Sequence, residues 1–207
     1  MNEPLIVRYR DATRLNHWFV AILFFLAALS GLALFHPSLF GLGGLFGGGQ
    51  WTRILHPFFG LVTVAGFVFL FAEVWRDNRW TDLDRQWMRK SKHLVAGDKT
   101  QMPPVGKYNA GQKLVFWGTA ISLLVLLLTG FMFWQPWFAE SFPILVRRIA
   151  VVLHALAATV LVLCIIVHIY AAIWVSGSIR AMTRGTVTER WARLNHPLWH
   201  RETTGRE

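Results

Sequence analysis

Long apolar runs alternate with polar, charged connections along this chain. Four runs of at least 18 residues contain no charged side chain except Glu73, close to the end of the second: Trp18–Phe35, Ile54–Trp75, Leu114–Trp134 and Ile149–Val175. A helix of about 20 apolar residues spans the roughly 30 Å hydrocarbon core of a bilayer. The pattern therefore predicts an all-α fold, a transmembrane four-helix bundle forming a single membrane domain over residues 1–207, with helices at about 17–35, 54–75, 113–134 and 149–175.

The composition supports a membrane protein and excludes several other classes. Charged residues make up 15% of the chain, against about 25% in average globular proteins, and there are 11 Trp and 16 Phe. The single cysteine, Cys164, allows neither an intrachain disulfide nor a thiolate-bound iron–sulfur cluster. The first apolar run lacks a small-residue cleavage site, so we expect it to be retained as a membrane helix.

The basic residues predict the orientation of the helices. Of 21 Lys and Arg, three precede the first run, nine lie between the second and third runs, and six follow the fourth, whereas the other two loops carry three. The positive-inside rule then places both termini, the loop 76–112 and the tail 176–207 in the cytoplasm. We expect a multi-pass membrane protein in contact with lipid. The net charge of +10 is explained by this topology and does not indicate nucleic-acid binding. The glycine-rich outer segment Gly41–Gly49 is expected to be a flexible, non-helical loop.

Four of the eight histidines lie in or at the mouths of the apolar runs: His17, His56, His154 and His168. Ionisable groups at membrane depth are costly, so such histidines indicate function. For any single one, a neutral histidine bonded to a neighbouring helix is an alternative. The remaining four are expected to be solvated or interfacial: His36, His93, His196 and His200.

The predicted topology gives these histidines two depths. His17 and His168 fall near the inner face, and His56 and His154 near the outer face. His154 and His168 are separated by 14 residues, roughly 21 Å along one helix, and point within about 40° of the same direction. Two imidazoles that face each other across a bundle are what a haem iron needs for axial ligation. The sequence thus predicts two b haems and one-electron transfer.

Other uses of the histidines fit less well. A zinc ion needs ligands that converge within a few ångströms, which two pairs at different depths cannot provide. A proton relay usually includes acidic groups at depth, and only Glu73 lies near the membrane. Arg53, isolated in the outer loop next to His56, could pair with a haem propionate.

Several stretches resemble the cytochrome b (gamma) subunit of respiratory membrane-bound formate dehydrogenases. The resemblance runs from about Ile6 to Arg201, and its most specific piece is VGKYNAGQK followed by the pair Phe116-Trp117. The matching segments are RILHPFFG at Arg53–Gly60, VGKYNAGQK at Val105–Lys113, LH at Leu153-His154, VHIYAAIWVSGSI at Val167–Ile179 and RWARLNHPLW at Arg190–Trp199. No such stretch falls in Gly41–Gly49.

The resemblance implies His17 and His168 as ligands of the cytoplasmic-side haem and His56 and His154 as ligands of the periplasmic-side haem. It further implies an electron-transfer and quinone-reducing subunit of a bacterial inner membrane that does not itself oxidise formate. In such complexes a molybdenum- or tungsten-containing alpha subunit oxidises formate, an iron–sulfur beta subunit relays the electrons, and menaquinone or ubiquinone accepts them at the inner side. The complex is expected to be a heterotrimer that can itself trimerise.

The quinone site is expected where VGKYNAGQK meets the third membrane helix. Asn109 and Gln112 can donate hydrogen bonds to a quinone carbonyl, with Lys107 nearby. The alternative is a capping box in which Asn109 and Gln112 begin that helix. Alternatives also remain for the whole chain: the cytochrome b of a nickel–iron hydrogenase or another molybdoenzyme, or, from a different class, a haemless membrane anchor or proton channel.

Overall fold

Four long helices dominate the structure, a computed structural model that describes residues 3–95, 97–98 and 100–205. They are α1 (Asp11–Phe35), α2 (Gly49–Val74), α5 (Ala110–Phe133) and α6 (Ile144–Trp174). All four are long and apolar enough to cross a membrane. The predicted membrane-spanning helical fold is confirmed, while the orientation of the termini stays a prediction.

Each long helix begins three to six residues before its predicted start and ends within one residue of its predicted end. The extra first turns are polar or mixed, as with Asp11 in α1 and Gln50 in α2. The first four amides of a helix have no partner within it and favour polar or acidic groups nearby. Hydropathy therefore marks where the apolar stretch begins, and the helix starts earlier.

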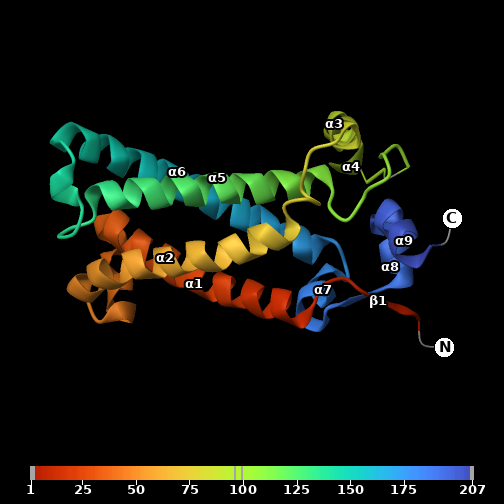
Figure 1. Ribbon diagram of the computed structural model, residues 1–207, viewed down its shortest axis with the longest axis horizontal. Coiled ribbons are helices and arrows are strands. Elements are labelled where there is room, and N and C mark those ends of the chain that lie inside the picture. The colour runs from red at the N-terminus through yellow and green to blue at the C-terminus, as the bar shows by residue number, and fades with distance from the viewer. Residues whose placement is uncertain (1–2, 96, 99, 206–207) are drawn as a thin grey trace. The chain divides into compact units, whose positions relative to one another are not determined.

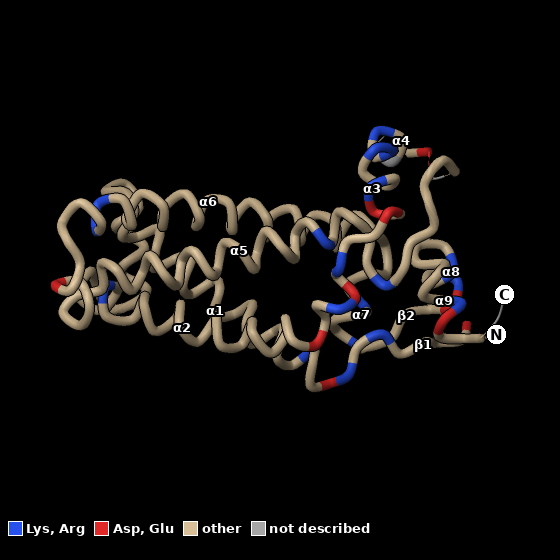
Figure 2. The backbone as a smooth tube through the Cα atoms, turned by 45° about the horizontal axis from the view of Figure 1, so that its top comes forward, with Lys and Arg blue, Asp and Glu red and all other residues tan. Residues whose placement is uncertain are grey.

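The chain divides into two compact units. We call Leu15–Ala72 with Gly118–Ile166 the bundle unit, and Met1–Arg14 with Glu73–Trp117 and Val167–Glu207 the polar unit. In the bundle unit the segments of the four long helices lie side by side (Figure 1). Its charged residues gather at the end that holds the two interhelical connections, and its remaining length carries none (Figure 2): Arg53, Glu140, Arg147 and Arg148.

The glycine-rich connection of the bundle unit is helical, so the prediction of a non-helical loop was wrong. Residues Pro37–Phe46 form a 3-10 helix, η1. Its N-cap residue is His36, whose ring accepts a hydrogen bond from the Ser38 amide at 3.2 Å. Each turn of a 3-10 helix closes with a bond over three residues, and proline suits its first position. Local capping therefore orders a segment whose composition disfavours a long α-helix. The second connection contains a short 3-10 turn, η2 (Ala139–Ser141).

The polar unit joins the two ends of the chain. Strand β1 (Leu5–Val7) pairs antiparallel with β2 (Thr186–Thr188), with Leu5 opposite Thr188. Three helices complete this part: α7 (Ser178–Arg184), α8 (Glu189–Asn195) and α9 (Pro197–Thr204). Their small core consists of Ala181, Val187, Ala192 and Trp199. Residues expected only to form a tail are thus folded around the N-terminal strand.

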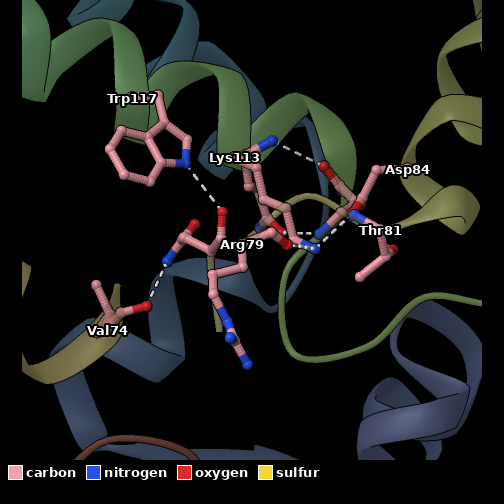
Figure 3. A network of polar contacts seen from close by, with 9 residues as sticks. Val74, Arg79, Thr81, Asp84, Lys113 and Trp117 are labelled. Carbon is pink, nitrogen blue, oxygen red and sulfur yellow. Dashed lines mark hydrogen bonds and ion pairs between the residues drawn. The ribbon is translucent and has the colours of Figure 1, made fainter. Parts of the chain in front are cut away.

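Two short helices, α3 (Asp82–Arg89) and α4 (Ser91–Val95), precede α5 in the polar unit. A buried ion pair joins α3 to the start of α5, with Lys113 Nζ 2.7 Å from Asp84 Oδ2 (Figure 3). The Thr81 amide and hydroxyl also donate to Asp84 Oδ2, both at 2.8 Å. One turn further along α5, the Trp117 indole donates to the Asn78 carbonyl. These contacts fix the first two turns of α5 within the polar unit.

Candidate functional site

His56 of α2 and His154 of α6 face each other in the bundle unit. Their ring centroids lie 6.3 Å apart, with the ring planes at 69° to each other. An imidazole nitrogen bound to a metal lies about 2 Å from it, so two rings on opposite sides of one ion have centroids about 6 Å apart. The separation therefore fits a metal held between the two rings. The geometry satisfies this test for a haem iron, and ligation itself stays a prediction.

A hydroxyl on the preceding helix faces the Nδ1 atom of each ring. Ser30 Oγ of α1 lies 3.0 Å from His56 Nδ1, and Thr129 Oγ1 of α5 lies 2.9 Å from His154 Nδ1. Both hydroxyls also donate to a carbonyl one turn back in their own helix, that of Leu26 or Val125.

This bonding pattern assigns the tautomer of both rings. Because each hydroxyl gives its proton to a carbonyl, the Nδ1–H of the facing ring donates to the hydroxyl oxygen. Nε2 of each ring then carries the lone pair that a metal requires. Hydrogen bonding of this kind, at the nitrogen that does not bind the metal, orients histidine ligands in metal sites.

A glycine follows each of the two hydroxyl residues. A Cβ atom on Gly31 would lie 3.0 Å from Cε1 of His56, and one on Gly130 would lie 3.5 Å from Cε1 of His154. The glycines thus leave room for the rings. This arrangement was not predicted, although the sequence contains a signal for it: in the two helical hairpins a hydroxyl residue stands 26 and 25 residues before the histidine, and a glycine directly follows that hydroxyl residue.

The predicted inner ligands lie in different units. His17 belongs to the part of α1 within the bundle unit, where its ring meets Trp18 edge-on with centroids 5.4 Å apart. The neighbouring Asn16 donates to the Gly66 carbonyl at 3.0 Å and so ties α1 to α2. His168 lies near the end of α6 in the polar unit, and its side chain is exposed. The pairing of His17 with His168 stays a prediction.

Arg53 lies in the first turns of α2, exposed at the charged end of the bundle unit. It lines a recess of about 340 Å³ together with His36 and Phe40. Its pairing with a propionate stays a prediction.

Asn109 and Gln112 form the capping box that the sequence offered as one alternative. The Gln112 amide donates to Asn109 Oδ1 and the Asn109 amide donates to Gln112 Oε1, both at 2.9 Å. These bonds use the side-chain oxygens only. The NH₂ groups keep their donor capacity, so capping and quinone binding are compatible. Lys107, expected to assist, makes an ion pair with Asp77 at 2.8 Å.

A pocket of about 200 Å³ adjoins Asn109 within the polar unit. Side chains from α3, the segment before α5, α5 itself and α9 line it, among them Asp84, Trp87, Tyr108, Lys113 and Glu202. Burial raises the pKa of Tyr108 well above its ordinary value, so its hydroxyl keeps its proton. The pocket combines an aromatic wall with hydrogen-bond donors.

His196 and His200 are buried, which contradicts their expected solvation. Their exposed fractions are 3% and 7%. Burial, together with the neighbouring Arg8 charge, lowers the pKa of His196 to about 3, so this ring is neutral at pH 7. The prediction failed because the helices on either side of His196 are short, and the polar partners of its ring, Gly106 and Arg8, lie in distant parts of the chain.

Comparison with known proteins agrees with this architecture. Residues 8–185 match the family described as prokaryotic cytochrome b561. The cytochrome b556(fdo) subunit of formate dehydrogenase from Escherichia coli K12 is 45% identical over 95% of this chain and 92% of its own length. The cytochrome b556(Fdn) subunit of the nitrate-inducible formate dehydrogenase of the same strain is 42% identical over 97% and 92%.

A formate dehydrogenase cytochrome b556 subunit of Haemophilus influenzae is 38% identical over 97% of this chain and 84% of its own length. Family membership supports haem b binding and electron transfer in a membrane. By these matches and its four membrane helices, the chain belongs to the prokaryotic cytochrome b561 family, alongside the cytochrome b556 subunits of formate dehydrogenases.

Proposed function

We propose that this chain is the membrane electron-transfer subunit of a formate dehydrogenase complex. It would connect a periplasmic iron–sulfur subunit with quinone at the cytoplasmic side, and hold two b haems. His56 and His154 would hold the outer haem, and His17 and His168 the inner one. The observation that carries the proposal is the facing pair His56 and His154, at 6.3 Å between ring centroids.

The residues around the outer pair have separate tasks. His56 and His154 present their Nε2 lone pairs, while Ser30 and Thr129 hold the Nδ1 protons and so fix the ring orientations. A haem held by these two imidazoles would supply reversible one-electron transfer. Arg53 would pair with a propionate carboxylate at the outer end.

The quinone site is proposed at the start of α5. The Asn109 side chain holds its oxygen toward the Gln112 amide, so its NH₂ group can donate to a quinone carbonyl. Trp87 offers an aromatic surface in the adjoining pocket. Quinone reduced here would take its protons from the cytoplasm, so inward electron flow would separate charge across the membrane.

The proposed partners follow from the same role. An iron–sulfur beta subunit would dock at the outer end of the helices and receive electrons from a molybdenum- or tungsten-containing alpha subunit. The heterotrimer is proposed to be capable of further trimerisation.

Haem quantitation tests the two-haem proposal. Pyridine-haemochrome analysis and a dithionite-reduced minus oxidised spectrum should give two haems per wild-type chain. His154→Ala should lose the outer haem and His168→Ala the inner one, so each variant should keep about one. His93→Ala, which changes a histidine outside the apolar runs, should retain both. A folded wild-type chain without haem, matured with haem available, would contradict the proposal and favour the anchor or channel.

A separate pair of variants tests the quinone site. Asn109→Asp keeps the oxygen that caps Gln112 and removes the NH₂ donor, so the KM for a short-chain quinone should rise about tenfold. Gln112→Glu also keeps the capping box and shows whether the second amide contributes. Reduction of the haems by formate should be unchanged in both. An unchanged KM in both variants would place the quinone elsewhere.

A further inference from the structure

Three consecutive backbone carbonyls precede Asn109, and each accepts a hydrogen bond from a distant segment. The Leu198 amide donates to the Val105 carbonyl at 3.1 Å. His196 Nδ1 lies 2.8 Å from the Gly106 carbonyl, and the Arg8 guanidinium donates to the Lys107 carbonyl. Residues 105–107 belong to no helix or strand, so these partners replace the bonds that regular structure would supply. We call Arg8, His196 and the Leu198 amide the carbonyl clamp.

The hydrogen bonds of the His196 ring allow only one position for its proton. A carbonyl only accepts, so the ring nitrogen facing Gly106 must be Nδ1–H. Nε2 then carries the lone pair, and Arg8 Nη2 lies 3.5 Å from it. The ring also lies against Trp191, with centroids 5.0 Å apart and planes at 36°. His196 is thus held as a neutral donor of fixed orientation.

Arg8 is held as firmly. Its guanidinium lies over the rings of Trp199 at 4.7 Å and Trp191 at 5.2 Å, and its exposed fraction is 7%. Cation–π contacts between desolvated partners are stronger than those at exposed sites. Tyr108, directly before Asn109, is tied to the same cluster by the hydrogen bond from Tyr9 Oη to Tyr108 Oη at 3.1 Å. The backbone entering α5 is therefore fixed from both ends of the chain.

We propose that His196 and Arg8 are positioning residues for the Asn109 amide, which they place through the backbone of residues 105–107. This inference rests on the proposed quinone site at Asn109. Asn109 caps the start of α5, so the position of its side-chain donor depends on the backbone just before it. Small displacements at such a site lower binding even when the donor itself is intact.

The test compares variants of His196 in the complete complex. His196→Phe keeps the ring volume and removes the donor to Gly106. His196→Asn carries an amide nitrogen close to the position of Nδ1 and should restore the bond. The matched control is His200→Gln, because His200 is a buried histidine of α9, the helix that directly follows His196, contacts Glu189 and lies outside the clamp.

Two measurements are made on each variant. One is KM and kcat for a short-chain quinone with formate as donor. The other is hydrogen–deuterium exchange at the amides of Asn109, Gln112 and Leu198. For His196→Phe we expect a KM about tenfold higher with kcat within twofold, and exchange about tenfold faster. His196→Asn should behave as wild type for both, and so should His200→Gln.

The outcomes separate the clamp from the quinone site. Unchanged exchange in His196→Phe would overturn the clamp. Faster exchange with an unchanged KM, while Asn109→Asp raises the KM, would show that the clamp does not position the donor and would overturn this inference. If neither variant alters the KM, the proposed quinone site fails and the inference fails with it. Should His196→Phe not assemble, Arg8→Met against Arg8→Lys gives the same comparison.

Discussion

At the scale of single residues, the two helical hairpins of the bundle unit place their histidines in the same way. Each ring lies against a hydroxyl and a glycine of the preceding helix. The clearance differs between the two sites, because a Cβ atom at Gly31 would come within 3.0 Å of its ring and one at Gly130 within 3.5 Å. A Cβ atom at Gly31 would therefore force the His56 ring to shift, whereas one at Gly130 would make an ordinary van der Waals contact with His154.

This difference predicts unequal effects of two otherwise identical substitutions. Gly31→Ala should displace the His56 ring by a few tenths of an ångström and lower outer-haem affinity, by roughly tenfold or more. Gly130→Ala should leave haem content close to wild type and serves as the control. Haem titration of the purified variants, followed by absorbance, measures both. Equal losses in the two variants would contradict the assignment of the glycines.

At the scale of elements, α3 is attached to α5 by a buried ion pair. The Asp84 and Lys113 side chains are both only 7% exposed. The neighbouring ion pair of the same helix, Asp82 with Arg85, is instead largely exposed. Removing one partner of a buried pair leaves an uncompensated charge, whereas exposed pairs contribute little.

We therefore expect Lys113→Met to destabilise the polar unit by about 3–5 kcal/mol. Arg85→Met should change its stability by less than about 1 kcal/mol. Thermal unfolding of the purified protein, followed by circular dichroism, compares the two. A similar small shift for both variants would show that Asp84 is satisfied by Thr81 alone.

The buried His196 gives the polar unit a dependence on pH. The folded state keeps this ring neutral down to about pH 3, while an unfolded chain takes up a proton below about pH 6.5. The contribution of the neutral His196 ring to the free energy of unfolding is therefore complete above pH 6.5 and is lost as the pH falls toward 3.

Over this range His196 should lower the free energy of unfolding of the polar unit by up to about 1.4 kcal/mol for each pH unit of acidification. His196→Asn has no titrating ring, so its stability should fall less steeply with acidification. The difference in melting temperature between wild type and variant, measured from pH 7 to pH 4, isolates this residue from the carboxylates. Parallel curves would show that the ring is protonated in the folded state.

At the scale of the whole molecule, the basic residues predict a cytoplasmic location for both termini and for the loop 76–112. Because Cys164 is the single native cysteine, it can be replaced, and the location of each loop can then be tested by labelling a cysteine introduced there. In a Cys164→Ser background, Glu140→Cys should react with an impermeant maleimide in spheroplasts, and Asp98→Cys only after permeabilisation. Both native side chains are exposed. The reverse pattern would overturn the orientation and, with it, the inner and outer assignment of the haems.

Much of the candidate site could be predicted from sequence because it depends on local properties. The predicted depth of His56 and His154 follows from their places in apolar helices, and the capping box of Asn109 and Gln112 follows from their spacing. Ser30 and Thr129 were not predicted. A hydroxyl inside an apolar helix commonly bonds to its own backbone, and only packing shows that it also faces a histidine.

Length and hydropathy are enough to predict the four membrane-spanning helices from the sequence, and they also predict which histidines lie at membrane depth. It took the folded arrangement to show that His56 and His154 face each other at 6.3 Å and that His196 is buried against residues 105–107. The physical reason is separation along the chain. His196 is 90 residues from Gly106 and 188 from Arg8, and no local pattern records which distant segment will cover a polar side chain.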